Sequence, residues 1–250
     1  MARVARNRAV WSPRKSTPRR RLIALAVLVG LGSAAGACAY HGNFDDPIQR
    51  RLQWFSFLDG GDIRADCAPG RPDRYRLVYN ARFAEQVRAY EVTADGAGGA
   101  YLTARARGPY SNLLRFGLDD PLAPFRWARS EATLSPAEFH AFKAALAADG
   151  FLAPPPVGDR YSSERFYWVA SGCVDGTHHF GAWRYPSARF AAMTVPGFLF
   201  ERDKTGTPVN LPHAVGGGDY AGPPGRTGEA GSDAPFWITI DADGIGGAPR

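Results

Sequence analysis

The sequence lacks the short motifs that mark the common catalytic machineries. Its 250 residues contain no Gly-x-Ser-x-Gly nucleophile elbow, no Walker phosphate-binding loop and no dinucleotide-binding glycine pattern after a predicted strand. We therefore expect a protein that is not an enzyme and uses no cofactor. With 45% hydrophobic and 12% aromatic residues, the chain can still bury the core of a folded domain.

Acidic residues are missing from the first 37 positions. This leader carries eight of the 30 basic residues, which leaves 22 basic against 24 acidic residues and a net charge of −2 in the remainder. The overall charge of +6 therefore comes from the leader. Because a near-neutral domain has no net attraction to phosphate, we expect no nucleic-acid partner.

An uncharged apolar stretch follows the last arginines of the leader. Residues 22–37 carry no charge and come directly after three arginines at 19–21, which is the basic and apolar pattern of an export signal. The arginines resist translocation while the apolar run enters the membrane. The pattern predicts a folded domain on the periplasmic side of a bacterial cell envelope, attached to the membrane through its N-terminal segment.

Three outcomes are open for this leader: lipidation, cleavage or retention as an uncut helix. The chemical state of Cys38 distinguishes them. Residues 35–38, Ala-Gly-Ala-Cys, resemble a bacterial lipobox in which the cysteine is lipidated, with Ala35 where the box usually has leucine. The same alanines form an acceptable cleavage site that would release the domain, and residues 22–40 are long enough to span a bilayer uncut at about 1.5 Å per residue. We expect retention by lipid or uncut helix, because no clear spacer separates the apolar run from the cysteine.

The chain has only three cysteines. Once Cys38 is assigned to the leader, Cys67 and Cys173 remain as an even pair in an oxidising compartment. We predict a disulfide bond between them, with two buried thiols as the alternative.

Composition divides the chain into five segments. They are a basic n-region at 1–21, the signal or anchor helix at 22–40, a linker and N-terminal segment at 41–73, an exported domain at 74–213 and a Gly/Pro-rich, mostly disordered tail at 214–250. In the linker segment, residues 50–58 fit either a helix or a strand. In the tail, residues 236–240 form an apolar island that suits an edge strand or a partner contact.

Short runs of alternating apolar and polar residues predict an antiparallel sheet. Residues 75–79, 86–92 and 100–106 predict three half-buried strands, and residues 197–200 are a further candidate. Two β-rich runs, 166–174 and 177–185, are separated only by Asp-Gly, which is a strong hairpin signal.

One predicted helix has capping signals in the sequence at both of its ends. Ser135 and Glu138 form a capping box and Gly150 suits the C-terminal cap of a helix over about 136–149. One face of it carries three large apolar side chains: Phe139, Phe142 and Leu146. The chain is therefore predicted to be α+β, with an antiparallel sheet of roughly five to seven strands packed against one main amphipathic helix and preceded by an N-terminal membrane or signal helix.

The two-residue turn predicts which residues of the hairpin pair with each other. Trp168 pairs with Trp183 and Cys173 with His178. An aromatic cluster gathers on one face: Phe166, Trp168, Trp183 and Tyr185. We favour core packing of this cluster against the helix at 136–149. If the cluster is exposed, it offers a binding platform for a sugar, lipid or peptide.

Cys173 and His178 are also the residues on which an enzyme hypothesis depends. They share a face of the hairpin, but no third or fourth residue is spaced to complete a metal site, and we expect none. The expected function is a membrane-anchored lipoprotein that acts as a binding or structural module, with another envelope protein, a peptide or a glycan as partner. The alternative is a small periplasmic hydrolase or thiol-dependent enzyme that uses these two residues.

Overall fold

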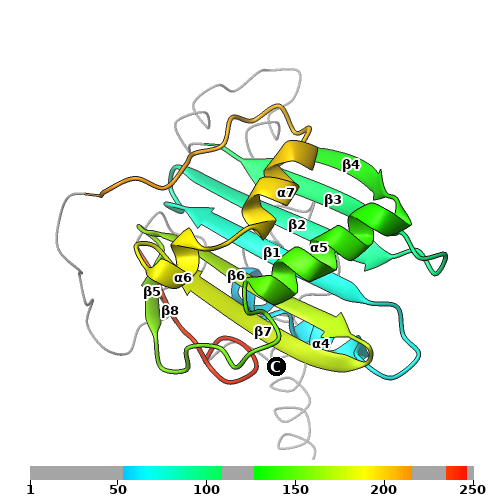
Figure 1. The fold of residues 1–250 in the computed structure, drawn as a ribbon. Coiled ribbons are helices and arrows are strands. Elements are labelled where there is room, and N and C mark those ends of the chain that lie inside the picture. Colours follow the sequence, from blue (N-terminus) through cyan, green and yellow to red (C-terminus); the bar gives the residue numbers. More distant parts are fainter. Residues whose placement is uncertain (1–52, 109–126, 216–234, 247–250) are drawn as a thin grey trace, which may run out of the picture. The chain divides into compact units, whose positions relative to one another are not determined.

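A computed structural model describes residues 53–108, 127–215 and 235–246 (Figure 1). The predicted leader with Cys38 lies outside these ranges, as does the glycine-rich stretch 216–234. None of the helices within the described ranges is long and apolar enough to cross a membrane.

An antiparallel sheet of six strands forms the centre of the fold (Figure 1). Its strands are β1 Arg74–Ala81, β2 Gln86–Ala94, β3 Ala100–Arg107, β4 Ala128–Leu134, β6 Phe166–Val174 and β7 Thr177–Arg184. Their order is β4-β3-β2-β1-β6-β7, so the β1–β3 meander joins the β6–β7 hairpin through β1 and β6. The predicted α+β class is confirmed. Five of the six strands, all except β4, were also predicted.

The β6–β7 hairpin has the predicted turn and register. Asp175 and Gly176 both have positive φ, 49° and 76°, as a two-residue type I′ turn requires. The pairs Trp168–Trp183 and Cys173–His178 form as expected from that turn.

Three helices lie over one face of the sheet (Figure 1). They are α5 Pro136–Ala148, α6 Ala188–Ala191 and α7 Val195–Arg202. The predicted capping box is present at Ser135 and Glu138, and Phe139, Phe142 and Leu146 of α5 enter the core on this face.

The prediction of a strand at 197–200 is wrong, because these residues belong to α7. Val195 and Leu199 are buried one helical turn apart, and Pro196 occupies the first turn of the helix. A run of four apolar residues is too short to distinguish a strand from one turn of a buried helix.

The opposite face of the sheet is also covered. It carries α3 Trp54–Asp59, α4 Gly61–Asp66 and a two-stranded sheet of β5 Arg160–Ser162 with β8 Trp237–Thr239. Side chains from β1, β2, β6 and β7 form a second core there, together with α3 and the segment around β8. Strands β1 and β2 are therefore buried almost throughout, rather than half-buried as predicted.

Two segments that were assigned outside the domain contribute to this second core. Residues 54–58 lie in helix α3, and the predicted tail includes β8, in and beside which Phe236, Ile238 and Ile240 are each no more than 1% exposed. The apolar island of the tail is thus a strand that pairs with β5.

A buried charge network links α4 to the sheet. The Arg76 side chain is 1% exposed and forms ion pairs with Asp62 of α4 and Glu91 of β2. Burial by itself raises the pKa of Glu91, but the charges of Arg76 and Arg105 outweigh it and hold that pKa at about 2. The glutamate therefore stays ionised and paired at neutral pH.

The predicted disulfide bond between Cys67 and Cys173 is present. It joins the residue after α4 to β6, with 5.4 Å between the two α carbons. Since the two cysteines are 106 positions apart, the bond closes a long loop and restricts the unfolded chain strongly.

Replacing both cysteines by serine is expected to lower the free energy of unfolding by about 4–5 kcal/mol, the value that loop-closure entropy gives for a loop of this size. Urea unfolding of the wild type and of the Cys67→Ser, Cys173→Ser variant measures the difference. A reducing agent should lower the midpoint of the wild type and leave that of the variant unchanged. Equal midpoints for both proteins without reductant would contradict a stabilising bond.

Candidate binding pocket

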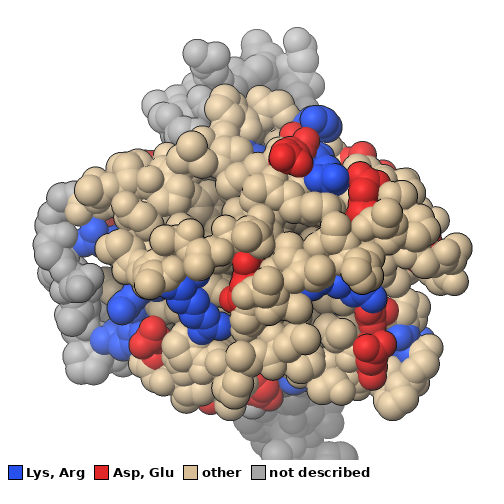
Figure 2. All heavy atoms as spheres, in the orientation of Figure 1, with Lys and Arg blue, Asp and Glu red and all other residues tan. Residues whose placement is uncertain are grey.

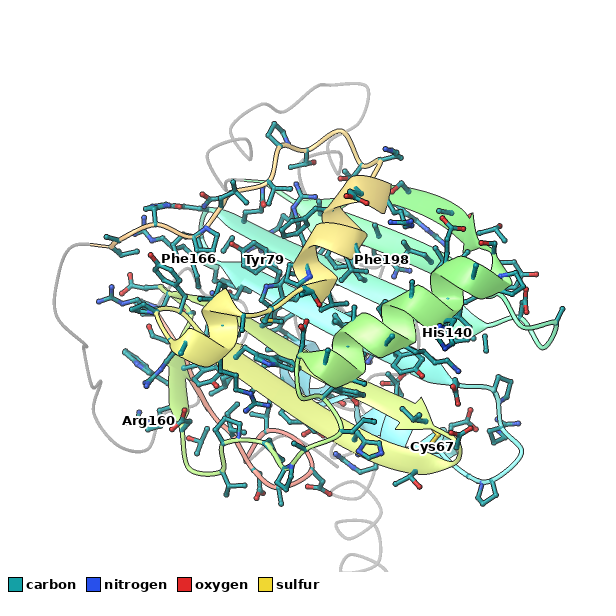
Figure 3. All side chains as sticks on the ribbon, viewed as in Figure 1. Cys67, Tyr79, His140, Arg160, Phe166 and Phe198 are labelled. Carbon is teal, nitrogen blue, oxygen red and sulfur yellow. A yellow bond between two sulfur atoms is a disulfide. The ribbon has the colours of Figure 1, made fainter. Side chains whose placement is uncertain are left out.

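A cavity of about 690 Å³ opens on the helical face of the sheet. Its floor is Tyr79 of β1 and Trp168 of β6, and its walls come from α6, α7 and the chain around Leu211. Figure 3 labels Tyr79 and Phe166 in this part of the sheet, and their rings lie 6.5 Å apart.

The floor is a layer of stacked aromatic rings. Tyr79 and Trp168 pair directly across β1 and β6, and their rings lie 4.8 Å apart at an angle of 19°. Phe200 of α7 packs against both rings, with centroid distances of 5.8 and 5.9 Å. Because side chains alternate along a strand, this register places both floor residues under the helices.

Asp149 lies outside α7 but holds the start of this helix in place through hydrogen bonds. This residue follows α5, and its carboxylate accepts hydrogen bonds from the backbone N–H groups of Thr194 and Val195, at 2.8 and 2.9 Å. It also accepts from the Thr194 hydroxyl at 3.0 Å. The carboxylate thereby supplies an acceptor for the free N–H groups at the first turn of α7.

Asp203 fixes the other end of α7. It forms an ion pair with the fully buried Arg88 of β2 and accepts from the Tyr90 hydroxyl at 2.8 Å. Burial alone would raise the pKa of Asp203, but hydrogen bonds from Thr205 and Tyr90 and the charge of Arg88 lower it. The carboxylate therefore remains ionised against the sheet.

The rim formed by Leu211 and Pro212 is also held by polar groups of the sheet. The Tyr79 hydroxyl donates to the carbonyl of Asn210 at 2.8 Å. The side chain of Gln86 donates to the Pro208 carbonyl at 2.7 Å and accepts from the Asn210 N–H at 3.0 Å. Leu211 itself is 61% exposed at the mouth of the pocket.

The opposite wall begins at Tyr185 and continues through α6. The Ser187 hydroxyl caps this short helix by accepting from the Phe190 N–H at 3.0 Å. Phe190 packs edge-on against Tyr185, with ring centroids 5.5 Å apart. Ala188 and Ala191 present small side chains on this wall.

The lining consists of uncharged side chains. Its side-chain polar groups are the Trp168 indole, the Tyr79 and Tyr185 hydroxyls and the Ser187 hydroxyl. Burial raises the pKa of Tyr79 above its ordinary value, so its hydroxyl stays neutral. In Figure 2 the surface around α6 and α7 is largely uncharged, while charged side chains gather at the outer end of α7 and below α6. This arrangement suits binding of an uncharged group.

The predicted aromatic cluster belongs to the core. Phe166, Trp168 and Trp183 are each no more than 1% exposed, and Tyr185 is half-buried. These four side chains therefore do not form a flat, open platform, because three of them are buried in the core. Two members of the cluster, Trp168 and Tyr185, nevertheless line the pocket.

The pair Cys173 and His178 does not form a thiol active site. Cys173 is bonded to Cys67, so it has no free thiolate to act as a nucleophile. His178 lies 2.9 Å from the Ser171 hydroxyl oxygen, and burial, together with the charge of Arg64, lowers its pKa to about 4. Ser171 itself is only 2% exposed.

Apart from Tyr185, the walls of the pocket were not predicted from the sequence. They come from 186–200 and 211–212, where apolar residues and prolines lack a clear period. The nearest available signal was the density of prolines and aromatic residues around Tyr185, Pro196 and Pro212.

Replacing Asp149 by alanine is expected to destabilise the protein by about 1–3 kcal/mol, because buried N–H groups of α7 lose their acceptor. Urea unfolding measures the loss, and hydrogen exchange should show faster exchange at Thr194 and Val195. Glu201→Ala, at an exposed position of the same helix, is the matched control and should unfold like the wild type. An unchanged midpoint for Asp149→Ala would contradict this role.

No protein-family model matches the chain, and no curated protein or solved structure matches it either.

Proposed function

We propose that this chain is a membrane-anchored, non-catalytic binding protein of the bacterial cell envelope, whose exported domain holds an uncharged, largely apolar ligand. The observation that carries the proposal is the pocket over Tyr79 and Trp168. Its volume of about 690 Å³ is within the range of about 300–1,000 Å³ typical of small-molecule sites.

The construction of the pocket supports binding. Its walls are held by polar contacts that lie outside the lining, at Asp149, Asp203 and Gln86. A ligand therefore meets walls that are already in place, and little ordering free energy opposes its binding. The apolar surface that it covers contributes about 25 cal/mol per Å².

Two features support a location outside the cytoplasm. The leader has the basic and apolar pattern of an export signal, and Cys38 follows it in a lipobox-like setting. The disulfide bond between Cys67 and Cys173 suits an oxidising compartment.

The pocket is tested with Nile red, a neutral apolar dye whose emission shifts to the blue when it leaves water. The protein used is the compact unit Cys38–Arg250, carrying Cys38→Ser and made without residues 1–37. Ala191→Trp fills the pocket with a large ring and should weaken dye binding at least about tenfold. Ala192→Trp, at the next, exposed position outside the lining, is the matched control and should bind like the parent.

Thermal unfolding and near-ultraviolet circular dichroism of both variants establish that they fold. Equal dye binding by the parent protein and Ala191→Trp would mean that the dye occupies another place. Absence of dye binding to the parent would overturn the binding function.

The anchor is tested on the full chain expressed in a bacterial host. The mass of the mature N-terminus should show acyl chains on Cys38 as the first residue, and the protein should sediment with membranes. Cys38→Ser should abolish the acyl mass. An unmodified mature N-terminus in the soluble fraction, or a C-terminal tag that faces the cytosol, would contradict anchorage outside the cytoplasm.

A further inference from the structure

The two edges of the six-stranded sheet differ in what lies beside them. Strand β7 ends the sheet on one side. The chain between α5 and β5 passes beside this strand, from Phe151 in the first core to Gly158, whose N–H donates to the Ile240 carbonyl in the second core (Figure 1). Strand β4 ends the sheet on the other side, and among the described residues only β3 pairs with it.

Strand β4 is regular enough to accept a further strand. Its seven residues pair with β3 in an unbroken register from Ala128 to Leu134, and they include no proline. Every second residue of an edge strand directs its backbone N–H and C=O away from the sheet. The outer edge of β4 therefore presents backbone groups with which another strand can form a ladder.

The exposed side chains of β4 carry opposite charges two positions apart. Arg129, Glu131 and Thr133 are exposed on the face of the sheet that carries α3 and α4, and they alternate with half-buried small residues on the helical face. Within the strand, Arg129 and Glu131 form an ion pair at 2.5 Å. The charges thus follow one another in an order that reads positive then negative along the strand.

A second copy of β4 complements this order in one antiparallel register. With Ser130 opposite Ser130 of the second copy, each Arg129 lies directly across from Glu131 of the other copy on the same face, so the ion pair occurs twice. A register centred on Arg129 or on Glu131 places like charges opposite each other. Opposite charges across two strands stabilise the pairing and like charges oppose it, so the sequence of β4 selects the register about Ser130.

The helical face of β4 carries the chain that follows α7. The Ser130 hydroxyl accepts from the backbone N–H of Lys204 at 3.1 Å. The side-chain nitrogen of Lys204 folds back and donates to the Glu201 carbonyl at 2.9 Å. Two copies paired about Ser130 would therefore bring these segments near each other, with each lysine held on the end of its own helix.

We propose that the outer edge of β4 is an interface between two copies of this chain, which join their sheets antiparallel about Ser130 and pair Arg129 of each copy with Glu131 of the other. The inference is independent of the pocket, whose lining includes no residue of β4. An edge of seven residues is a small interface, so the association is weak in solution. Two copies held in one membrane would meet at a higher effective concentration.

Charge reversal tests the interface by sedimentation equilibrium over a concentration series, with the leaderless protein described above. Arg129→Glu and Glu131→Arg each place like charges opposite each other at two positions, and each should weaken self-association at least about tenfold. An equimolar mixture of these two variants should associate again, because every glutamate of one then faces an arginine of the other. The double reversal Arg129→Glu, Glu131→Arg should associate like the parent.

Glu164→Arg is the matched control. This exposed position lies between β5 and β6, and its reversal changes the net charge by the same amount as Glu131→Arg. It should leave self-association unchanged. Near-ultraviolet circular dichroism of each variant establishes that it folds.

A cysteine at the centre of the interface tests the register. Cys67 and Cys173 are bonded to each other and Cys38 is replaced, so an added cysteine is the single free thiol. Directly opposed residues of antiparallel strands have α carbons about 4.5–5.5 Å apart, which a disulfide can bridge. Under mild oxidation Ser130→Cys should form a covalent dimer faster than Ala132→Cys, which faces Ala128 of the second copy; a non-reducing gel measures both.

The remaining outcomes contradict the proposal. A parent protein that stays monomeric at every concentration and does not cross-link through Ser130→Cys would overturn the interface. Self-association that neither single reversal weakens would place the contact elsewhere and overturn it equally. Faster cross-linking of Ala132→Cys would overturn the register about Ser130. Nile red binding by the same variants reports on the pocket separately, so failure of the interface leaves the binding function standing.

Discussion

The pairing of β1 with β6 is the constraint on which the rest of the structure depends. It joins the meander to a hairpin more than 80 positions later in the chain, and it places Tyr79 beside Trp168. Each of the two cores contains side chains from both strands. A shift of this pairing by one residue would turn every side chain of one strand to the opposite face, and both the floor of the pocket and the second core would be lost.

The walls over this floor depend on buried carboxylates. Asp149 and Asp203 are each paired or hydrogen-bonded at one end of α7, and Arg88 carries the countercharge from the sheet. Buried ion pairs contribute little net stability compared with apolar packing, but breaking one is costly. Such contacts therefore act mainly to determine the position of α7. Polar contacts are needed for this because no side chains of the described residues pack against α7 on the open side of the pocket.

The parts that were predictable from sequence are those set by local physics. The Asp-Gly turn determines the hairpin register, and the Ser135–Glu138 capping box determines the start of α5. The disulfide was inferred from the number of cysteines and the compartment. The position of α7, by contrast, depends on Asp149, 45 and 46 residues from its partners, and no local pattern encodes that contact. The covering of the second face by β8 is long-range in the same way, which is why a tail was expected there.

The two tryptophans of the hairpin are held in the core in different ways. Trp168 packs in a layer of rings with Tyr79, Tyr90 and Phe200. The other tryptophan of the hairpin, Trp183, has its N–H satisfied by the Asp149 carbonyl, so the sheet can accommodate a paired indole. Both side chains are 1% exposed, so the stack of rings at Trp168 and the contact of Trp183 with Asp149 each contribute to the core beneath the pocket.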